Sequence, residues 1–318
     1  MIIVSLSGDG DYTSIQEAIN SITDKTSRMI FIKKGIYREK LHLVKSNLTF
    51  IGEDETKTII TFNDYAKKEL ENGTTMQTFR SYSTFIHGNH LTFMNLTFEN
   101  TAGKGSEVGQ AIASYVDGDC IHFKNCRFLG HQDTLFTAPL PPSSVIPGSF
   151  IGPGEHLPKI VGRHYYENCY IEGDIDFIFG GATSYFESCT VFSKDVPNYS
   201  YITAASTPSD EKYGYVFHQC KLVGSAHEQS VFLGRPWREF AHVVYLNCFL
   251  GPHIHEAGWN DWDKPHQSLK FYEFQNIGPG ADRSKRVDFC KELSIKESSL
   301  YTKEQVLRDW KPYKKHPS

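Results

Sequence analysis

The sequence lacks the features that mark several common classes of protein. Its 318 residues contain no apolar run long enough to cross a membrane as a helix and no block of like charge. The seven cysteines include no CxxC pair and no zinc-binding spacing, so no metal site is predicted. The GxSxG, HExxH and GxxxxGKS/T motifs are also absent. These absences argue against a membrane protein, a zinc module, a serine hydrolase and a nucleotide-binding loop.

Charge and the N-terminal segment indicate little about partners or compartment. The net charge is −4, and no basic patch interleaved with aromatic residues suggests a nucleic-acid partner. The first eight residues are apolar but have no basic region and no long hydrophobic stretch, which is not typical of a signal peptide. As written, the chain is expected to be cytoplasmic, or secreted if a signal was removed; the sequence leaves its localisation open.

A short pattern recurs six times in the chain. Each copy reads aromatic, any residue, a polar residue, Cys or Leu, any residue, apolar. Internal repetition of this kind is typical of solenoids. The copies are residues 91–98, 121–128, 164–171, 184–191, 215–222 and 243–250, and their Cys or Leu positions are Leu96, Cys126, Cys169, Cys189, Cys220 and Cys248.

The repeated segments are rich in β-branched and aromatic residues and are bounded by turn residues, so they are predicted to be strands. We therefore predict an all-β fold, a single-stranded parallel β-helix in which each coil adds one strand to each sheet. A β-sandwich is the competing fold, but it does not explain a repeated residue column. The cysteines are expected to form an interior ladder of small buried residues, and a disulfide between neighbouring rungs remains open.

The two ends of the chain predict short helices. Residues 13–22 carry apolar side chains at 15, 18, 19 and 22, which is helical spacing, and Thr13 with Gln16 or Ser14 with Glu17 can form a capping box. This helix is expected to cover the open end of the core. Residues 302–310 predict a C-terminal helical tail. No linker divides the chain, so residues 1–318 are expected to form one domain.

Four polar motifs stand out beside the predicted strands. They are Gln110, the pair Gln132 and Asp133, Asp176, and Arg235 with its neighbour Trp237. Asp176 lies inside the apolar run Ile175–Phe179, where a carboxylate is costly unless another group pairs with it. Equivalent positions on successive coils of a parallel solenoid lie side by side, so we expect these side chains to meet in one cleft.

This set of side chains predicts the cleavage of a neutral carbonyl compound. One carboxylate can act as the nucleophile and a second, protonated one as the acid. Glutamine amides can donate hydrogen bonds to an oxyanion, an arginine can orient the nucleophile, and a tryptophan offers a flat face to a sugar. Taken singly, each motif could equally be a turn or a polar ladder inside a β-helix.

With these motifs, the sequence resembles the pectin methylesterases, or pectinesterases, over nearly its whole length. The resemblance implies a right-handed parallel β-helix that hydrolyses the C6 methyl esters of galacturonate in pectin and releases methanol, without a metal or an organic cofactor. The matching segments are Asp11–Ile19, Gly35–Glu39, Thr78–Ser81, Asn100–Gly103, Gln110–Ala113, Gln132–Leu135, Asp176–Gly180, Leu233–Trp237, Ala257–Trp259 and Gly278–Gly280.

The resemblance also implies a catalytic role for each motif residue. Asp176 attacks the ester carbonyl, while Gln110 and Gln132 stabilise the charge that develops on its oxygen. Asp133 donates a proton to the departing methanol and then activates the water that hydrolyses the acyl-enzyme. Arg235 bonds Asp176, and we expect it to lower the pKa of Asp176 while burial and the nearby anion raise that of Asp133.

The same resemblance implies a set of substrate-binding residues. They are Trp237, Gln110, Thr78, Arg235, Phe179 and Ile175. The chain also departs from the family pattern. Asp133 and Asp176 are further apart than in plant members because of a proline-rich loop near Thr137–Pro158, and Ser114, Tyr115 and His131 replace residues more usual in the family. These departures concern the choice of substrate rather than the reaction.

Three alternatives accompany this prediction. The first is an esterase of the same fold that acts on short methylated oligogalacturonides or another acyl substrate. The second is a catalytically inactive β-helix that only binds polysaccharide, which the intact set of motif residues disfavours. The third is a calcium-dependent pectate lyase, which needs an acidic cluster that the sequence does not contain. A monomer is expected in each case.

Overall fold

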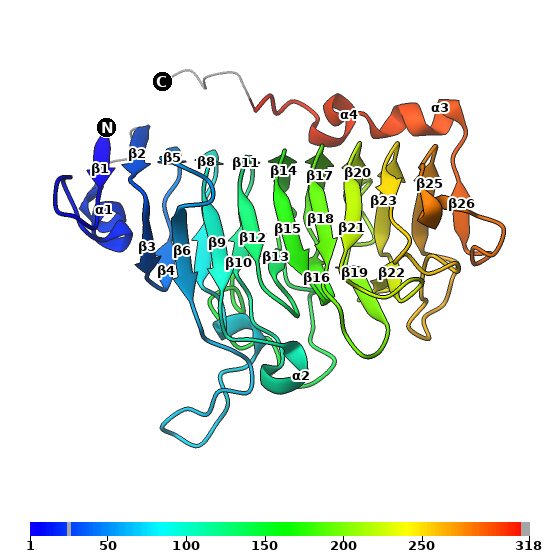
Figure 1. Ribbon diagram of the computed structural model, residues 1–318, viewed down its shortest axis with the longest axis horizontal. Coiled ribbons are helices and arrows are strands. Elements are labelled where there is room, and N and C mark those ends of the chain that lie inside the picture. Colours follow the sequence, from blue (N-terminus) through cyan, green and yellow to red (C-terminus); the bar gives the residue numbers. More distant parts are fainter. Residues whose placement is uncertain (24–26, 313–318) are drawn as a thin grey trace.

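The computed structural model describes residues 1–23 and 27–312, which wind into successive coils of three parallel sheets (Figure 1). Each full coil contributes one strand to each sheet in turn. Sheet A contains β1 (Ile2–Val4), β2 (Arg28–Ile32), β5 (Leu48–Gly52), β8 (Leu91–Met94), β11 (Ile121–Lys124), β14 (Arg163–Glu167), β17 (Thr183–Glu187), β20 (Tyr215–His218), β23 (His242–Leu246), β25 (Lys270–Phe274) and β26 (Cys290–Glu292).

The other two sheets complete each coil. Sheet B contains β3 (Gly35–Arg38), β6 (Thr58–Phe62), β9 (Thr97–Asn100), β12 (Arg127–Leu129), β15 (Tyr170–Gly173), β18 (Thr190–Ser193), β21 (Lys221–Gly224) and β24 (Phe249–Leu250). Sheet C contains β4 (Leu41–Leu43), β7 (Thr84–His87), β10 (Ser114–Asp117), β13 (Leu135–Thr137), β16 (Ile175–Gly180), β19 (Ser200–Ala205) and β22 (Val231–Pro236). The predicted right-handed parallel β-helix is confirmed.

Each recurring segment turns the corner from sheet A to sheet B. Its polar residue has a positive φ, for example 55° at Asn95, 52° at Asn125 and 50° at Asn168. Asparagine tolerates this left-handed conformation better than most residues. The side-chain amides also form a ladder, in which Nδ2 of Asn168 donates to Oδ1 of Asn125 at 2.8 Å and Nδ2 of Asn125 to Asn95 at 3.2 Å. The prediction of one strand per segment is therefore wrong, because the left-handed residue divides the segment into two strands.

The aromatic and cysteine columns of the repeat both face the core. Seven rings stack at centroid distances of 4.4 to 5.1 Å. The six Cys or Leu side chains of the neighbouring column are also buried, and all seven cysteines are free thiols. The interior ladder is confirmed, and no disulfide joins its rungs. The stacked rings are Phe50, Phe93, Phe123, Tyr166, Phe186, Phe217 and Tyr245.

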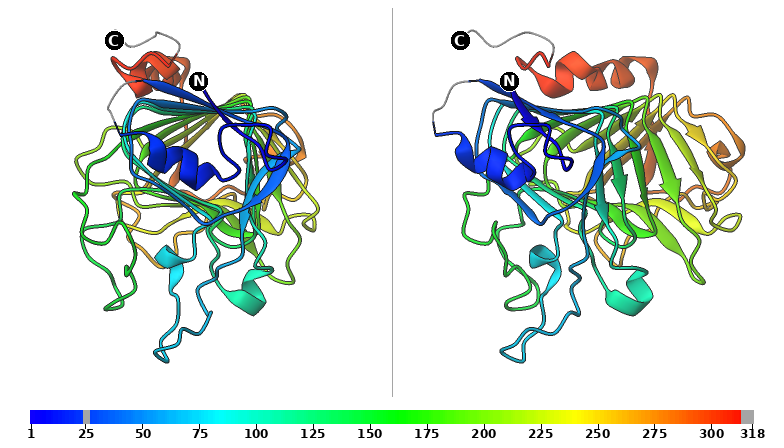
Figure 2. Two further views of the ribbon diagram at one scale, coloured as in Figure 1. Left: turned by 90° about the vertical axis from the view of Figure 1, so that its left-hand side faces the viewer. Right: turned by 60° about the vertical axis from the view of Figure 1, so that its left-hand side comes forward.

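The predicted N-terminal helix is α1 (Ile15–Ser21), which covers the open end of the coil (Figure 2). Ile15 and Ile19 are buried in the main core, and the side chain of Ser14 accepts a hydrogen bond from the backbone N–H of Glu17. The carboxylate of Glu39 accepts two further backbone hydrogen bonds from this first turn. The helix and its Ser14 cap are confirmed, whereas the reciprocal bond of a capping box is not among the contacts of α1; the carboxylate of Glu39 binds this turn instead.

The C-terminal tail contains α3 (Ile295–Ser298), the 3₁₀ turn η3 (Ser299–Tyr301) and α4 (Lys303–Leu307). It folds back along the outer face of sheet A instead of closing the far end of the coil (Figure 1). There Val306, Leu307 and Trp310 pack with Tyr165 and Tyr185 of the sheet. The tail thus covers apolar side chains that the outer face of sheet A would otherwise expose.

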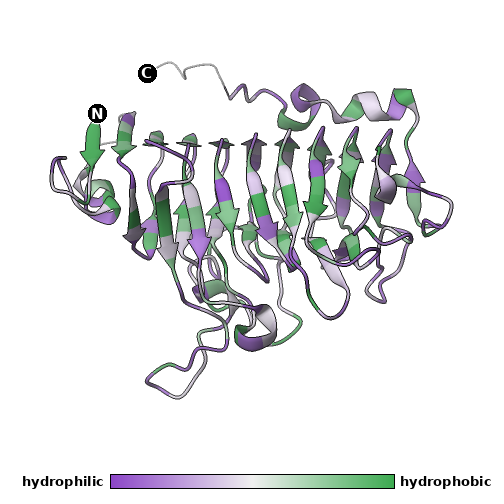
Figure 3. Cartoon of the chain, in the orientation of Figure 1, coloured by the Kyte–Doolittle hydropathy of each residue, from purple (hydrophilic) through white to green (hydrophobic). Residues whose placement is uncertain are grey.

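Single strands carry both hydrophobic and hydrophilic residues, as expected when one face lies in the core (Figure 3). None of the helices within residues 1–23 and 27–312 is long and apolar enough to span a bilayer. The remaining short helices lie in connections between strands; they are η1 (Thr78–Arg80), α2 (Gly105–Val108) and η2 (Pro279–Ala281).

Candidate active site

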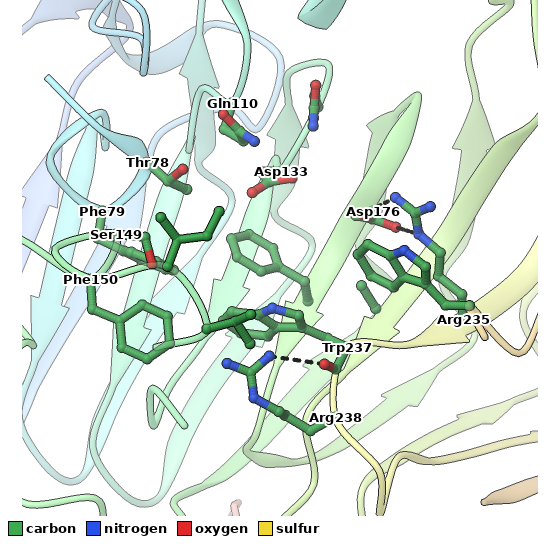
Figure 4. A pocket seen from close by; sticks show the side chains of 16 residues that line it. Thr78, Phe79, Gln110, Asp133, Ser149, Phe150, Asp176, Arg235, Trp237 and Arg238 are labelled. Atoms are coloured by element: carbon green, nitrogen blue, oxygen red, sulfur yellow. Dashed lines mark hydrogen bonds and ion pairs between the residues drawn. The ribbon is translucent and has the colours of Figure 1, made fainter. Parts of the chain in front are cut away.

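A cavity of about 340 Å³ opens on the outer face of sheet C. Its wall combines residues of the sheet with residues of six connecting segments, and most of the predicted site residues are among them (Figure 4). The lining residues are Thr78, Phe79, Gln110, Gln132, Asp133, Val145, Ile146, Ser149, Phe150, Asp176, Phe179, Ala204, Arg235, Trp237, Arg238 and Trp262.

Strand pairing in sheet C brings the two carboxylates together. Leu135 of β13 pairs with Ile178 of β16, so Asp133 and Asp176, each two residues earlier, lie at equivalent places on adjacent coils. Arg235 lies on β22 itself, two strands beyond β16, rather than beside a strand as predicted. Two strand spacings are roughly 10 Å, a distance that a long arginine side chain can cover together with the carboxylate it meets.

A β-bulge in β16 turns Asp176 away from the core. Pairing with β19 slips by one residue between Ile175 and Ile178, and Asp176 has a φ of 51°. Because of this extra residue, Phe177 and Ile178 can both face the core while the carboxylate faces the cavity. Asp133 also has a positive φ, of 65°. Backbone conformations that are unfavourable for such residues are concentrated at functional sites.

Arg235 holds both oxygens of Asp176. Its Nε donates to Oδ1 at 2.9 Å and its Nη2 donates to Oδ2 at 2.7 Å. The guanidinium also lies between two aromatic rings, 3.9 Å from the ring centre of Tyr201 and 3.7 Å from that of Trp262. These contacts limit the guanidinium to one plane, so the carboxylate is presented in one orientation.

The two buried carboxyl groups differ in how their charge is compensated. Burial, and then the negative charge of Asp176, raise the pKa of Asp133 well above its ordinary value, which confirms the expectation for this residue. Burial also raises the pKa of Asp176, although the hydrogen bonds and charge of Arg235 oppose the rise. Arg235 does lower the pKa of Asp176, but the expectation of a net lowering is wrong in sign, because desolvation outweighs the arginine. Asp176 remains the carboxyl group that ionises more readily.

Two amide side chains line the cavity near Asp133. Gln110 lies between α2 and β10, and Figure 4 shows its amide beside Asp133. Gln132 directly precedes Asp133, and its side chain packs against the first residue of α2. A Cβ atom on Gly105 would lie 2.6 Å from Oε1 of Gln132, so only glycine leaves room for this amide. Both amides can thus donate hydrogen bonds to a group bound in the cavity.

Aromatic rings form another part of the cavity wall. Phe79 lies near-parallel to Trp237 with ring centres 6.3 Å apart, and meets Phe150 edge-on at 5.6 Å. Phe179 contacts Trp237 at 5.8 Å. Flat apolar surfaces beside hydrogen-bonding groups are suited to a sugar ring, which has apolar faces and polar edges.

Comparisons with known proteins agree with this geometry. The pectinesterase family model matches residues 1–140 and 149–309. The chain belongs to the pectinesterase family. Pectinesterase 31 of Arabidopsis thaliana is 36% identical over 313 residues, which cover 95% of this chain and 90% of the relative. Pectinesterase QRT1 of the same plant is 34% identical, covering 93% of this chain and 74% of the relative.

Solved structures of pectin methylesterases share the fold. A pectin methylesterase in complex with a hexasaccharide superposes with a TM-score of 0.82 at 27% identity, covering 98% of both chains. The enzyme from carrot has a TM-score of 0.79 at 28% identity, covering 96% of this chain and 92% of the carrot chain.

In this pectinesterase the structure gathers all but one of the predicted site residues. Thr78, Phe179 and Trp237 line the cavity together with the catalytic candidates. Ile175 does not lie in the cavity wall that the described residues form; its carbonyl instead accepts a hydrogen bond from the backbone N–H of Asp133. His131, one of the departures from the family pattern, lies 2.9 Å from Asp174 through Nδ1 and Oδ2.

Sequence reasoning missed the rings on either side of Arg235. Tyr201 comes from β19, where nothing in the local pattern separates it from other strand residues. Two signals could have pointed to Trp262: tryptophan is rare in this chain, and the segment Ala257–Trp259, which resembles the family, ends only three residues earlier. The chain has four tryptophans, and two of them, Trp237 and Trp262, line the cavity.

Proposed function

We propose that this chain hydrolyses the methyl esters of galacturonate in pectin and releases methanol. The observation that carries the proposal is the pairing of Asp176 with Arg235 beside Asp133, a second carboxyl group with a strongly raised pKa. An ester can be cleaved by one ionised and one protonated carboxyl group. Structural relatives that bind a hexasaccharide support a pectin-derived polysaccharide as the occupant of the cavity.

The first half of the reaction forms an acyl-enzyme. An oxygen of Asp176 attacks the ester carbonyl carbon, and the carbonyl oxygen takes up the negative charge of the tetrahedral intermediate. The amides of Gln110 and Gln132 line the cavity and donate hydrogen bonds to this oxygen. As the bond to the methoxy group breaks, Asp133 transfers its proton to the leaving oxygen, and methanol departs. The product is an anhydride between Asp176 and the galacturonate.

The second half restores the enzyme. Asp133, now ionised, takes a proton from a water molecule, and the resulting hydroxide attacks the anhydride carbonyl. The bond to Asp176 breaks, which releases galacturonic acid and returns both aspartates to their starting states; the acid then loses its proton to solvent. Arg235 keeps Asp176 oriented in both halves. We propose the monomer as the active form, since every residue in these steps comes from one chain.

The decisive experiment measures methanol released from highly methylated pectin by the wild type and by Asp176→Ala. Release by the wild type and none by the variant would support ester hydrolysis with Asp176 as the nucleophile. Asp195→Ala is a control, because Asp195 is an exposed aspartate outside the cavity. Activity confined to short methylated oligogalacturonides would favour an oligomer esterase. A wild type that is inactive on both substrates would refute the proposal.

A further inference from the structure

One segment of the cavity wall lies outside the family match. The pectinesterase model matches the chain up to residue 140 and resumes at residue 149. The segment Pro141–Gly148, which we call the lip, has the sequence PPSSVIPG and contains no ionisable side chain. It lies in the first half of the long connection between β13 and β14.

The lip presents two apolar side chains at the catalytic cavity. Val145 and Ile146 both line the cavity that contains Asp133 and Asp176. In the free protein Val145 is 82% exposed and Ile146 is 69% exposed. Large apolar side chains that stay exposed beside a reactive centre indicate a ligand-binding surface. They contribute little to the stability of the fold, because they are not buried in the protein.

The lip is held in place from both sides. Nη2 of Arg238 donates to the carbonyl oxygen of Ser143 at 3.2 Å, and Nη1 of Arg238 donates to that of Trp237 at 2.9 Å. Val145 and Ile146 form the apolar tip of the lip. After this tip, the backbone N–H of Ser149 donates to the carbonyl of Ile146 at 3.1 Å, which closes a turn.

The residue that follows this turn joins the cavity wall. Phe150 packs on Phe79, and Figure 4 shows both rings on the side of the cavity opposite Arg235. Three prolines within the lip further restrict its backbone. The tip is therefore ordered before any ligand arrives.

The chemistry of the polymer then decides what the tip can select. Each galacturonate of pectin carries at C6 either an ionised carboxylate or a neutral methyl ester. A carboxylate placed against Val145 and Ile146 would lose water without gaining a charged partner from the lip. A methyl ester at the same place would bury apolar surface on both partners, which is favourable.

We propose that Val145 and Ile146 bind the methyl ester of a galacturonate next to the one being hydrolysed, so that the enzyme prefers densely methylated stretches of pectin. This inference rests on the proposed function, because it identifies which form of the substrate the same cavity selects. The lip is then a specificity element of this chain that its relatives' shared pattern does not contain.

The test compares kcat/KM on pectins of equal length with high and low methylation. The double variant Val145→Ser, Ile146→Ser is expected to lose about tenfold on highly methylated pectin, the range associated with small apolar contacts, and to change less than about twofold on lightly methylated pectin. Ile160→Ser is the matched control: Ile160 is 69% exposed, as Ile146 is, and belongs to the same connection but lies outside the cavity wall. It is expected to leave both values unchanged.

The possible outcomes separate a failure of the lip proposal from a failure of the proposed esterase function. Both substituted side chains are exposed, so the double variant is expected to fold normally, which its melting temperature checks. If the double variant has the same ratio of kcat/KM between the two pectins as the wild type, whether or not both values fall, the proposed role of the lip is refuted and the proposed esterase function stands. A wild type that releases no methanol from either pectin would overturn the proposed function and the lip with it.

Discussion

Replacing Arg235 with alanine is expected to slow methanol release and to move its whole pH profile to higher pH. Arg235 holds Asp176 through hydrogen bonds of 2.9 and 2.7 Å and opposes the rise that burial causes in the pKa of Asp176. Without the guanidinium, that pKa rises further. Arg235 also lowers the pKa of Asp133, so the variant raises this second pKa too.

The direction of both shifts follows from the roles of the two groups. The reaction needs Asp176 ionised, so the acid limb of the profile reports its titration and moves to higher pH when its pKa rises. The reaction also needs Asp133 protonated, so the alkaline limb moves to higher pH for the same reason. Both limbs report apparent pKa values of the coupled pair Asp133 and Asp176. A shift of both limbs in the same direction is what identifies Arg235 as a neighbour of both carboxyl groups.

The magnitude can be worked from the burial of the pair. The side chains of Arg235 and Asp176 are only 15% and 10% exposed. Removing one partner of a buried ion pair costs about 3–5 kcal/mol. If most of that cost falls on the reactive, ionised form of Asp176, kcat/KM on the acid limb should fall by roughly 10² to 10³.

The assay is methanol release from highly methylated pectin across the pH range, for the wild type, Arg235→Ala and Arg235→Lys. Lysine keeps the charge but loses the two-point hydrogen bonding and the stacking on Tyr201 and Trp262. The lysine variant should therefore move both limbs part of the way back toward their wild-type positions, while the rate at the pH optimum stays low. Limbs that do not move in Arg235→Ala would refute the electrostatic reasoning, and full recovery by lysine would refute the need for the two-point geometry.

Three further predictions concern the same framework. Asp133→Asn should abolish methanol release yet raise the melting temperature at neutral pH. The pKa of Asp133 is raised in the folded state, so the wild type loses stability as pH rises from the pKa of an unfolded aspartate, about 3.9, through the folded-state pKa. Asparagine cannot ionise and avoids this loss. Thermal unfolding at several pH values checks this, and a gain that persists in acid would contradict it. Trp262→Ala removes a ring 3.7 Å from Arg235 and should lower kcat/KM by about 2- to 30-fold, whereas Trp262→Phe keeps most activity; equal values for both variants would count against the clamp. Asn125→Ala should cost about 1–2 kcal/mol in urea unfolding because it forces alanine into a left-handed corner, and it also loses the side-chain ladder; Asn125→Gly relieves the backbone part, so identical costs would exclude backbone strain.

The amino-acid sequence by itself determined the coil and most of the cavity. A parallel solenoid places the same kind of side chain at the same point of successive turns, so its columns are visible as a recurring pattern, here a polar residue followed by Cys or Leu. The capping helix was predictable because Ile15 and Ile19 follow helical spacing and Ser14 supplies a cap. The motif residues were predictable as a group because equivalent positions on adjacent coils must lie side by side.

Only the tertiary structure decided the properties that depend on groups distant in sequence. The bulge that turns Asp176 outward arises from pairing with β19, which no local pattern reveals. The sign of its pKa shift was wrong at the sequence level because Arg235 was visible as a motif whereas the extent of burial was not. Tyr201 and Trp262 reach Arg235 from two separate segments, and the lip reaches the cavity through a hydrogen bond to Arg238. Desolvation and contact between remote segments exist only once the coils are stacked, which is why the repeats predict the scaffold and the assembled structure decides the chemistry.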